Sequence, residues 1–326
     1  MKTKEQILYI LEENKGKFIS GEEIAEKLSV SRNAVWKAIN SLKKDGYIIT
    51  AVTNRGYCLS ESNGAFTSHS VYEKLDIDLK EKLSISVVPC VGSTNSELKA
   101  LGESGGADGT VLIALEQTAG RGRLGRSFYS PKDTGLYLSI LLRPEFSAED
   151  SLYITVCAAV SAAEAIEKAA DVKAGIKWVN DIYVEGKKAC GILTEASLNF
   201  ESGQLNYAVL GIGINLITRT FPNELKDIAA SVSDGEKDLR AFIAAEFLNS
   251  FFSYYKELKN LSFLPEYRRR SILTGKEISF TRGNEVFEGK VIEIDDKVRL
   301  LVELKNGEIK AFSSGEVTLV KGGLIK

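Results

Sequence analysis

A loop rich in glycine and arginine follows an apolar, β-prone run at residues 110–116. Residues 117–126 read Gln-Thr-Ala-Gly-Arg-Gly-Arg-Leu-Gly-Arg. Glycine leaves backbone N–H groups open to a phosphate, and arginine can hold a phosphate through two parallel hydrogen bonds. Because the three arginines would repel one another, we expect the loop to be mobile until an anion orders it. The GxxxxGK[ST] phosphate loop is absent, and a solvated basic turn is the alternative interpretation.

A second group of polar side chains lies around a predicted hairpin. The β-prone run 175–183 carries a cation, an indole and an amide–carboxylate pair, namely Lys177, Trp178, Asn180 and Asp181. A turn at residues 185–187 leads to the next strand, which opens with Lys188. A lysine there can stabilise negative charge on a carboxylate or phosphate. Two alternatives stay open: Trp178 as a packing residue, and Lys188 with Lys187 as solvated turn residues.

Small polar side chains follow an earlier strand. Residues 83–88 alternate in hydropathy, and Ser93, Thr94 and Asn95 come soon after. Hydroxyl and amide groups at one point suit a small polar ligand, although the same residues are typical of an ordinary helix N-cap. Downstream, a strand has glycine at alternate positions, Gly211 and Gly213, and its bare face lets a flat ligand lie against the backbone.

Histidine and cysteine usage restricts the chemistry. His69 is the only histidine among 326 residues, and the four cysteines form no CxxC pair. This excludes metal sites with several histidines, and any histidine-dependent triad without His69. His69 lies in a Gly/Ser-rich stretch, so we expect it in a linker or on the surface. The cysteines should be reduced and mostly buried in a cytoplasmic protein, with no secretion signal and no membrane span.

The N-terminal segment is predicted to bind DNA. Residues 1–60 contain 10 Lys and Arg against 7 Asp and Glu in a chain of net charge −2, and a basic head suits an anionic polymer. Ser20 begins a capping box for a helix at residues 21–28. After a tight turn, Ser31 can cap a helix at residues 32–44, which is the spacing of a helix-turn-helix.

The second of these helices has an apolar face and a polar face. Arginine and asparagine can contact base edges, while lysine neutralises phosphates. Two β-prone runs, 47–49 and 57–59, flank a turn with Arg55, as in the wing of a winged helix. A helix-turn-helix retained for protein contact is the alternative. The predicted DNA contacts are Ser31, Arg32, Asn33, Trp36, Lys37, Asn40 and Arg55.

Apolar periodicity predicts the remaining framework. Residues 135–142 form a strand that should be buried on both faces, and residues 152–170 and 239–258 form long helices. Short alternating runs between residues 276 and 312 predict a small β-barrel. The polar, Gly/Ser-rich stretch 62–70 marks a domain boundary.

Five short motifs occur in a fixed order. They are Gly-Ser-Thr-Asn, Gln-x-x-Gly-Arg-Gly-Arg, Lys-Trp-x-Asn-Asp, Lys-x-x-Gly-Ile-Leu and Gly-Ile-Gly-Ile-Asn. Together with the run Ser-Arg-Asn-Ala-Val-Trp-Lys in the N-terminal segment, these motifs make the chain resemble the bifunctional ligase–repressor subfamily of biotin–protein ligases over essentially its whole length. Val179 stands where that family usually has proline, and Phe128 where it usually has tryptophan. Both residues are bulky, like those they replace, so they affect the expected reaction rates more than the resemblance to the family.

The resemblance implies an α+β multidomain protein. Its parts are an N-terminal winged helix-turn-helix over residues 1–62 and a central mixed-sheet α/β ligase domain over residues 66–265. A small SH3-like β-barrel follows over residues 271–326.

The resemblance also implies three overlapping sets of site residues. Lys188, Arg121 and Arg123 should be catalytic, and Asp181 should bind Mg²⁺. The biotin-binding set is Ser93, Thr94, Asn95, Gln117, Gly120, Arg121, Gly122, Arg123, Lys188, Gly191 and Ile192. The set for ATP and the adenylate is Arg121, Arg123, Phe128, Lys177, Asn180, Asp181, Asn215, Ala230 and Ser231.

Ligases of this family join biotin to ATP, hold biotinyl-5′-adenylate and pass biotin to a lysine of a biotin carboxyl carrier domain. The implied cofactors are therefore ATP, biotin and Mg²⁺. The implied partners are the carrier protein, operator DNA and a second copy of the chain when the adenylate is bound, with no membrane partner. Two alternatives stay open: a lipoate–protein ligase, and a ligand-sensing repressor without catalysis.

Overall fold

The chain divides into two compact units, Met1–Glu73 and Lys74–Lys326. Residues 61–65, near the predicted first domain boundary, lie outside the described residues, so the predicted domain limits remain predictions. No helix in the described part of the chain is long and apolar enough to cross a membrane. The computed structural model describes residues 3–44, 47–60, 66–144, 151–198, 204–235, 238–282, 285–313 and 315–319.

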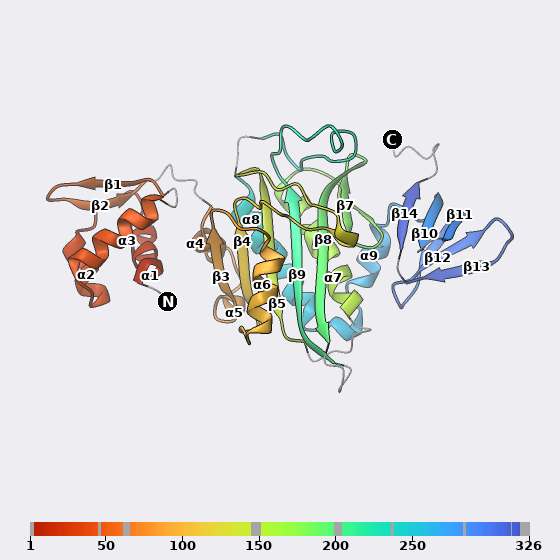
Figure 1. The fold of residues 1–326 in the computed structure, drawn as a ribbon, viewed down its shortest axis with the longest axis horizontal. Helices are drawn as coiled ribbons and strands as arrows, with labels where there is room; N and C mark the ends of the chain where they lie inside the picture. The colour runs from red at the N-terminus through yellow and green to blue at the C-terminus, as the bar shows by residue number, and fades with distance from the viewer. Residues whose placement is uncertain are drawn as a thin grey trace. The chain divides into compact units, whose positions relative to one another are not determined.

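The first unit contains the predicted helix-turn-helix followed by a β-hairpin (Figure 1). Ser20 caps the second helix by accepting a hydrogen bond of 3.0 Å from the Glu23 N–H, and Ser29 ends that helix with a left-handed φ of 53°. In the hairpin, Val52 lies opposite Gly56. The elements are α1 (Thr3–Glu13), α2 (Gly21–Leu28), α3 (Arg32–Lys44), β1 (Ile49–Val52), β2 (Gly56–Leu59) and α4 (Ser68–Tyr72).

Helix α4 lies in the stretch predicted to be a linker. Thr67 and Ser70 form a reciprocal capping box, in which each side chain accepts a 3.1 Å hydrogen bond from the other's backbone N–H. His69 is therefore helical, and its ring meets the Tyr9 ring edge-on at 5.6 Å between centroids. His69 was expected in a linker or on the surface: it lies in a helix, because the capping box lets this polar segment form a helical turn, and its side chain is partly exposed.

The second unit is built on a seven-stranded mixed sheet (Figure 1). The strand order is β3-β4-β5-β9-β8-β7-β6, in which only the β3–β4 pair is parallel. The elements are β3 (Ser84–Val88), α6 (Thr94–Glu103), β4 (Thr110–Ala114), β5 (Gly135–Leu142), α7 (Ser151–Ala169), β6 (Gly175–Lys177), β7 (Asp181–Val184), β8 (Lys187–Leu198), β9 (Leu205–Asn215) and α8 (Arg240–Tyr255), with short helices α5 (Ile77–Lys80) and α9 (Leu264–Arg269).

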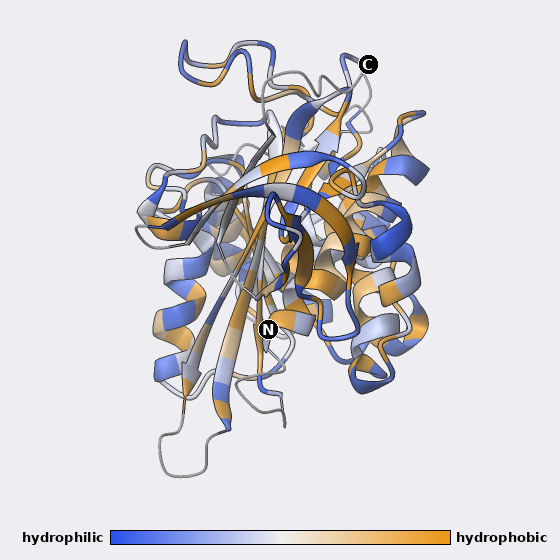
Figure 2. Ribbon diagram, turned by 90° about the vertical axis from the view of Figure 1, so that its right-hand side faces the viewer, coloured by the Kyte–Doolittle hydropathy of each residue, from blue (hydrophilic) through white to orange (hydrophobic). Residues whose placement is uncertain are grey.

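Helices cover both faces of this sheet. Helix α6 lies in front of it in Figure 1, with α7 and α8 behind. Strand β5 is buried along its whole length, as its apolar run predicts. Coloured by hydropathy in Figure 2, the central strands are largely hydrophobic, while the helices alternate hydrophobic and hydrophilic turns. Burial of this apolar surface is the main term that stabilises the unit.

The C-terminal part of the second unit is a five-stranded antiparallel sheet of order β13-β12-β11-β10-β14. No described pairing joins β13 to β14, so the SH3-like barrel remains a prediction, whereas the sheet itself is observed. Trp178, which precedes β7, packs against Phe280 and donates a 2.9 Å hydrogen bond to the Val298 carbonyl. The strands are β10 (Glu277–Arg282), β11 (Glu285–Ile294), β12 (Leu300–Leu304), β13 (Ile309–Phe312) and β14 (Glu316–Leu319).

Candidate functional site

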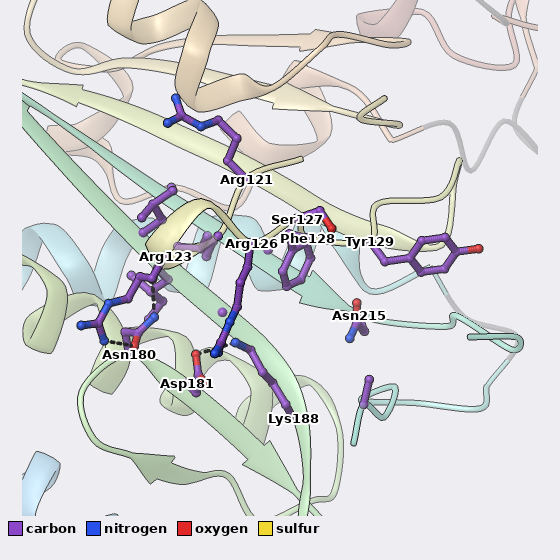
Figure 3. Close-up of a pocket in the computed structure, with 18 of the residues that line it drawn as sticks. Arg121, Arg123, Arg126, Ser127, Phe128, Tyr129, Asn180, Asp181, Lys188 and Asn215 are labelled. Atoms are coloured by element: carbon purple, nitrogen blue, oxygen red, sulfur yellow. Dashed lines mark hydrogen bonds and ion pairs between the residues drawn. The ribbon is translucent and has the colours of Figure 1, made fainter. Parts of the chain in front are cut away.

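A cavity of about 440 Å³ in the second unit collects most of the predicted site residues (Figure 3). This volume falls within the range of small-molecule pockets. Its walls come from the start of α6, the arginine loop, strands β7 to β9, residues 221–229 and the C-terminal sheet. The predicted residues that line it are Ser93, Thr94, Asn95, Gln117, Arg121, Gly122, Arg123, Phe128, Lys177, Asn180, Asp181, Lys188, Gly191, Ile192 and Asn215.

Hydroxyl and amide side chains form one end of the cavity. Thr94 donates through its N–H and its hydroxyl to Gln117 Oε1, at 2.9 and 3.1 Å. The hydroxyl of Ser139, on β5, lies 2.7 Å from Thr94 Oγ1 and 2.6 Å from Asn95 Oδ1. Ser93 is the N-cap residue of α6, but its side chain makes no capping hydrogen bond. Thr94, Asn95 and Ser139 are buried and fixed by one another, which suits recognition of a small polar ligand.

The alternate glycines of β9 make room for two of these site residues. A Cβ at Gly211 would lie 2.0 Å from Asn95 Oδ1, and a Cβ at Gly213 would lie 2.5 Å from the Phe128 ring. The bare face that the sequence predicts is present. In this structure the protein's own amide and aromatic ring occupy it.

The arginine loop is closed on itself rather than extended. The Gly122 N–H donates to the Arg126 carbonyl at 2.7 Å, and the Phe128 N–H donates to the Gly120 carbonyl at 2.9 Å. Arg123 donates to Asn180 Oδ1 at 2.9 Å. These contacts place the loop across the cavity, and the expected mobility of the loop in the absence of an anion stays a prediction.

The three arginines of this loop point in different directions (Figure 3). Arg126 points toward Asp181 and Lys188, whereas Arg121 points away from them. The Arg121 guanidinium instead forms an ion pair of 3.2 Å with Glu195. Arg126 was not among the predicted site residues, although it is one of the three loop arginines.

Lys188 and Asp181 form an ion pair of 2.6 Å in the middle of the cavity. Lys188 is also fixed by its backbone, which donates to the Ile228 carbonyl at 2.9 Å and accepts from the Ala230 N–H at 3.0 Å. Burial, together with the Asp181 charge, raises the pKa of Tyr183 to about 12, so its hydroxyl stays protonated at neutral pH. The cavity thus contains cations and a neutral donor beside a single carboxylate.

Asn215 is the last residue of β9. Its side chain is buried, and its Oδ1 has no hydrogen-bond partner among the described residues. A buried acceptor without a partner costs free energy, about 1–3 kcal/mol, unless a ligand satisfies it. Three apolar side chains, Phe221, Leu225 and Ile228, line the cavity as well.

Three predicted site residues lie outside the cavity lining, and one open alternative concerns Trp178. Gly120, Ala230 and Ser231 do not line the cavity. Gly120 permits a close approach, because a Cβ there would lie 2.4 Å from the Phe128 carbonyl oxygen. Trp178 lines the cavity but is buried at 4% exposure against the C-terminal sheet, which favours the packing interpretation. The peptide bond between Trp178 and Val179 is cis.

The donor set fits Mg²⁺ only together with a nucleotide. No group of three or more His, Cys, Asp or Glu residues that could hold a metal ion occurs in the described part of the chain. Asp181 is a single carboxylate already paired with Lys188. Since Mg²⁺ is often held by one or two carboxylates plus substrate phosphates, Asp181 fits an ion that arrives with ATP.

The predicted DNA contacts lie on the first unit, and all of them except Asn40 are exposed. Ser31, Arg32, Asn33, Trp36 and Lys37 are exposed, and Trp36 is 55% exposed despite its large apolar surface. Asn40 is half-buried. In the hairpin, the exposed Arg55 lies over the Phe18 ring at 4.3 Å.

Sequence reasoning missed three polar residues of the site or its support: Ser139, Arg126 and Glu195. Ser139 lies within an apolar strand, where a lone buried hydroxyl was the available signal. Glu195 follows the Lys-x-x-Gly-Ile-Leu motif by two residues, but nothing local connects it to Asn95 or Arg121. Among the cysteines, Cys58, Cys157 and Cys190 are buried and Cys90 is exposed, all four free, as expected.

Three family models match the chain: an HTH domain at residues 3–58, the biotin/lipoate A/B protein ligase family at 87–215, and the biotin protein ligase C-terminal domain at 273–320. The bifunctional ligase/repressor BirA of Bacillus subtilis is 35% identical over 91% of this chain and 93% of its own. The protein of that name from Escherichia coli K12 is 29% identical over 93% and 94%.

A solved structure agrees with these relatives. The biotin protein ligase from Aquifex aeolicus in complex with biotin and ATP has a TM-score of 0.62 and 31% identity, covering 73% of this chain and 98% of that chain. The order of the three matched models, the identity along nearly the whole length and the shared fold lead to one conclusion. The chain belongs to the biotin–protein ligases, and within them to the bifunctional ligase–repressors.

Proposed function

We propose that the protein activates biotin with ATP and transfers it to a lysine of a biotin carboxyl carrier domain. The observation that carries the proposal is the composition of the cavity of about 440 Å³. One end offers fixed hydroxyl and amide groups, the middle offers Lys188 and Arg123, and the far end offers the unpartnered Asn215 oxygen. The polar ring of biotin would fit the first part, and its carboxylate with the α-phosphate of ATP would fit the second. The amino-bearing base of ATP would fit the third.

The proposed reaction needs no protein nucleophile. A biotin carboxylate oxygen attacks the α-phosphorus of ATP, the bond to the β-phosphate oxygen breaks, and pyrophosphate leaves. The carrier lysine, as a free amine, then attacks the carbonyl carbon of biotinyl-5′-adenylate, AMP leaves and the amine loses a proton. Both steps depend on positioning and charge stabilisation, which agrees with a site free of histidine.

The side chains would divide this work. Ser93, Thr94, Asn95 and Gln117 would bind the biotin ring. Lys188 would release Asp181 and stabilise negative charge between the carboxylate and the α-phosphate. Arg123, held by Asn180, would contact phosphate.

The nucleotide base would lie beside Asn215. An exocyclic amino group can donate to the unpartnered Oδ1, which adenine offers and guanine does not at the same position. Phe128 would stack on a flat ligand from the position it already occupies over β9. Mg²⁺ bound with ATP would neutralise phosphate charge, and Asp181 is the residue that would hold it.

The test uses the full chain with labelled biotin, ATP, Mg²⁺ and a biotin carboxyl carrier domain. We expect label on the carrier, no competition by lipoate, and GTP unable to replace ATP. Asn215→Ala should raise the KM for ATP by about tenfold while leaving the KM for biotin unchanged. Tight biotin binding without label on the carrier would instead favour the ligand-sensing repressor, and competition by lipoate would favour the lipoate ligase.

The first unit carries the proposed second function, binding of operator DNA. The supporting observation is that an exposed tryptophan and basic and amide side chains share the outward face of α3. The adenylate-bound form would dimerise on a two-fold operator. A duplex selected from random DNA by the protein with biotin and ATP should bind weakly without them in a mobility shift.

Three finer assignments remain part of this proposal. The C-terminal sheet would be the SH3-like barrel, the domain limits would be residues 1–62, 66–265 and 271–326, and the protein would act in the cytoplasm.

A further inference from the structure

Glu195 on β8 connects two parts of the candidate site that are far apart in sequence. One carboxylate oxygen, Oε2, accepts a 3.0 Å hydrogen bond from Asn95 Nδ2 at the start of α6. The other, Oε1, forms the 3.2 Å ion pair with Arg121 of the arginine loop. The Glu195 side chain is 22% exposed, so solvent screens these contacts only in part.

The contact with Asn95 fixes which way its amide faces. A carboxylate only accepts hydrogen bonds, so it holds the NH₂ group on its own side and the amide oxygen on the other. That oxygen accepts from Ser139 at 2.6 Å, and the NH₂ group also donates to the Leu193 carbonyl at 3.3 Å. Since Ser139 also lies 2.7 Å from Thr94 Oγ1, the orientation of Asn95 sets the direction of hydrogen bonds in the whole cluster.

The contact with Arg121 gives this arginine a role different from its neighbours. Figure 3 shows Arg123 and Arg126 directed toward Asn180, Asp181 and Lys188, and Arg121 directed away from them. Arg121 therefore lies on the side of the hydroxyl–amide cluster, where its partner also holds Asn95. Gln117, at the start of the same loop, accepts from Thr94, so the loop and the cluster touch at two points.

We propose that Glu195 is a positioning residue that couples the arginine loop to the ligand-ring cluster, with Arg121 as its tether. The inference rests on the proposed biotin-ligase function and changes the role expected for Arg121. Arg121 acts on the biotin end of the cavity through Glu195, and phosphate is left to Arg123 and Arg126.

The test is a double-mutant cycle in the full-length protein. Glu195→Gln keeps the size and shape of the side chain but lets either end of its amide face Asn95. Arg121→Gln removes the tether. Both single variants and the double variant are compared with the wild type for the KM values of biotin and ATP, for kcat, and for binding of biotin alone by calorimetry. Glu97→Gln removes an exposed carboxylate two residues after Asn95 and is the matched control.

Each single variant should weaken biotin binding and raise the biotin KM by about tenfold, with the ATP KM and kcat within twofold of wild type. The double variant should be no worse than the worse single variant, because one coupled unit is lost. Glu97→Gln should match the wild type, and thermal unfolding should show all variants folded.

Other results overturn the inference. A higher ATP KM in Arg121→Gln, with unchanged binding of biotin alone, would make Arg121 a phosphate clamp independent of Glu195. Effects that add in the double variant would also exclude the tether. Failure of the wild type to form an adenylate from biotin and ATP would reject the proposed function itself, whereas an active wild type with a normal Glu195→Gln variant rejects only the inference.

Discussion

The outward face of α3 and the cavity of the second unit present their polar side chains in opposite ways. On α3 the predicted contacts come from one regular helix and are exposed, as with Arg32, Asn33 and Lys37. In the cavity they come from segments far apart in the chain and are largely buried, with Asn95 4% and Asn215 5% exposed. A surface that reads a polymer uses side chains free to move, whereas a pocket for a small ligand fixes its groups in advance.

The difference implies different responses to mutation. Side chains on an exposed helix face have few shared partners, so their contributions should add. Side chains in the cavity are linked through common hydrogen-bond partners. Asn95, for example, bonds to both Ser139 and Glu195, so one substitution should disturb several side chains.

Lys188→Met should lower the rate of adenylate formation by about 10²–10³-fold, because the main cation facing the reacting oxygens is lost and Asp181 loses its counter-ion. The rate is measured as pyrophosphate release in a single turnover. The neighbouring Lys187→Met is the control, since the Lys187 ammonium donates to the Lys226 carbonyl instead and is absent from the cavity lining. Equal losses in both variants would return Lys188 to the class of solvated turn residues.

Sequence patterns predicted both ends of α2 and the start of α3 to the residue, because caps and apolar periodicity are local properties. They missed α4, whose capping pair Thr67 and Ser70 lies in a stretch that composition alone assigns to a linker. They also missed β14, whose four residues are too few to show a period. Strand order in the central sheet depends on long-range pairing, and no local pattern encodes it.

The site divides in the same way. The five motifs indicated most of the cavity lining, since each is a short local run. They could not indicate that Arg121 pairs with Glu195, which lies 74 residues further along the chain. Ser139 and Gly120 show the same limit. One is a buried hydroxyl within an apolar strand, and the other permits a close backbone approach to Phe128 that no local pattern indicates.

The first unit also contains a buried acid, Glu12, in contrast to the exposed polar side chains of α3. Burial raises the pKa of Glu12 to about 7, with a smaller upward contribution from Glu73, while Thr67 and Lys15 lower it. Glu12 Oε2 lies 3.6 Å from His69 Nδ1 and has no hydrogen-bond partner among the described residues. The folded unit therefore binds a proton that the unfolded chain releases above its ordinary pKa of 4.5.

The sign of the pH effect follows from this raised pKa. The contribution of Glu12 to stability should be fully present below pH 4.5, fall as the pH rises to about 7, and then level off, with a total loss of about 3 kcal/mol. Glu12→Gln should remove this slope and should be more stable than the wild type at pH 8. Urea unfolding at pH 5 and pH 8 measures both variants, with the exposed Glu13→Gln as control. Identical slopes in Glu12→Gln and wild type would show that the buried acid is not the source.

Arg32→Ala should weaken binding to the selected operator duplex by roughly 1–3 kcal/mol, the value of one good base contact, and should leave the unfolding free energy unchanged. The double variant Arg32→Ala/Lys37→Ala should show the sum of the two single effects, in contrast to the cycle at Glu195. Lys27→Ala on α2, where Lys27 pairs with Glu23, is the control. Non-additive losses on α3 would contradict the contrast drawn between helix face and cavity.

The smallest expected effect concerns Ser31, for which the structure provides a role that needs no DNA. Its Oγ accepts a 3.2 Å hydrogen bond from the Ala34 N–H, as Ser20 accepts one of 3.0 Å from the Glu23 N–H. Ser31→Ala and Ser20→Ala should therefore each lower the unfolding free energy by about 1 kcal/mol. Only Ser31→Ala should also weaken operator binding if its hydroxyl contacts DNA, measured where both variants are fully folded. Equal operator affinities would leave Ser31 as a cap and make Arg32 the first residue of α3 to meet DNA.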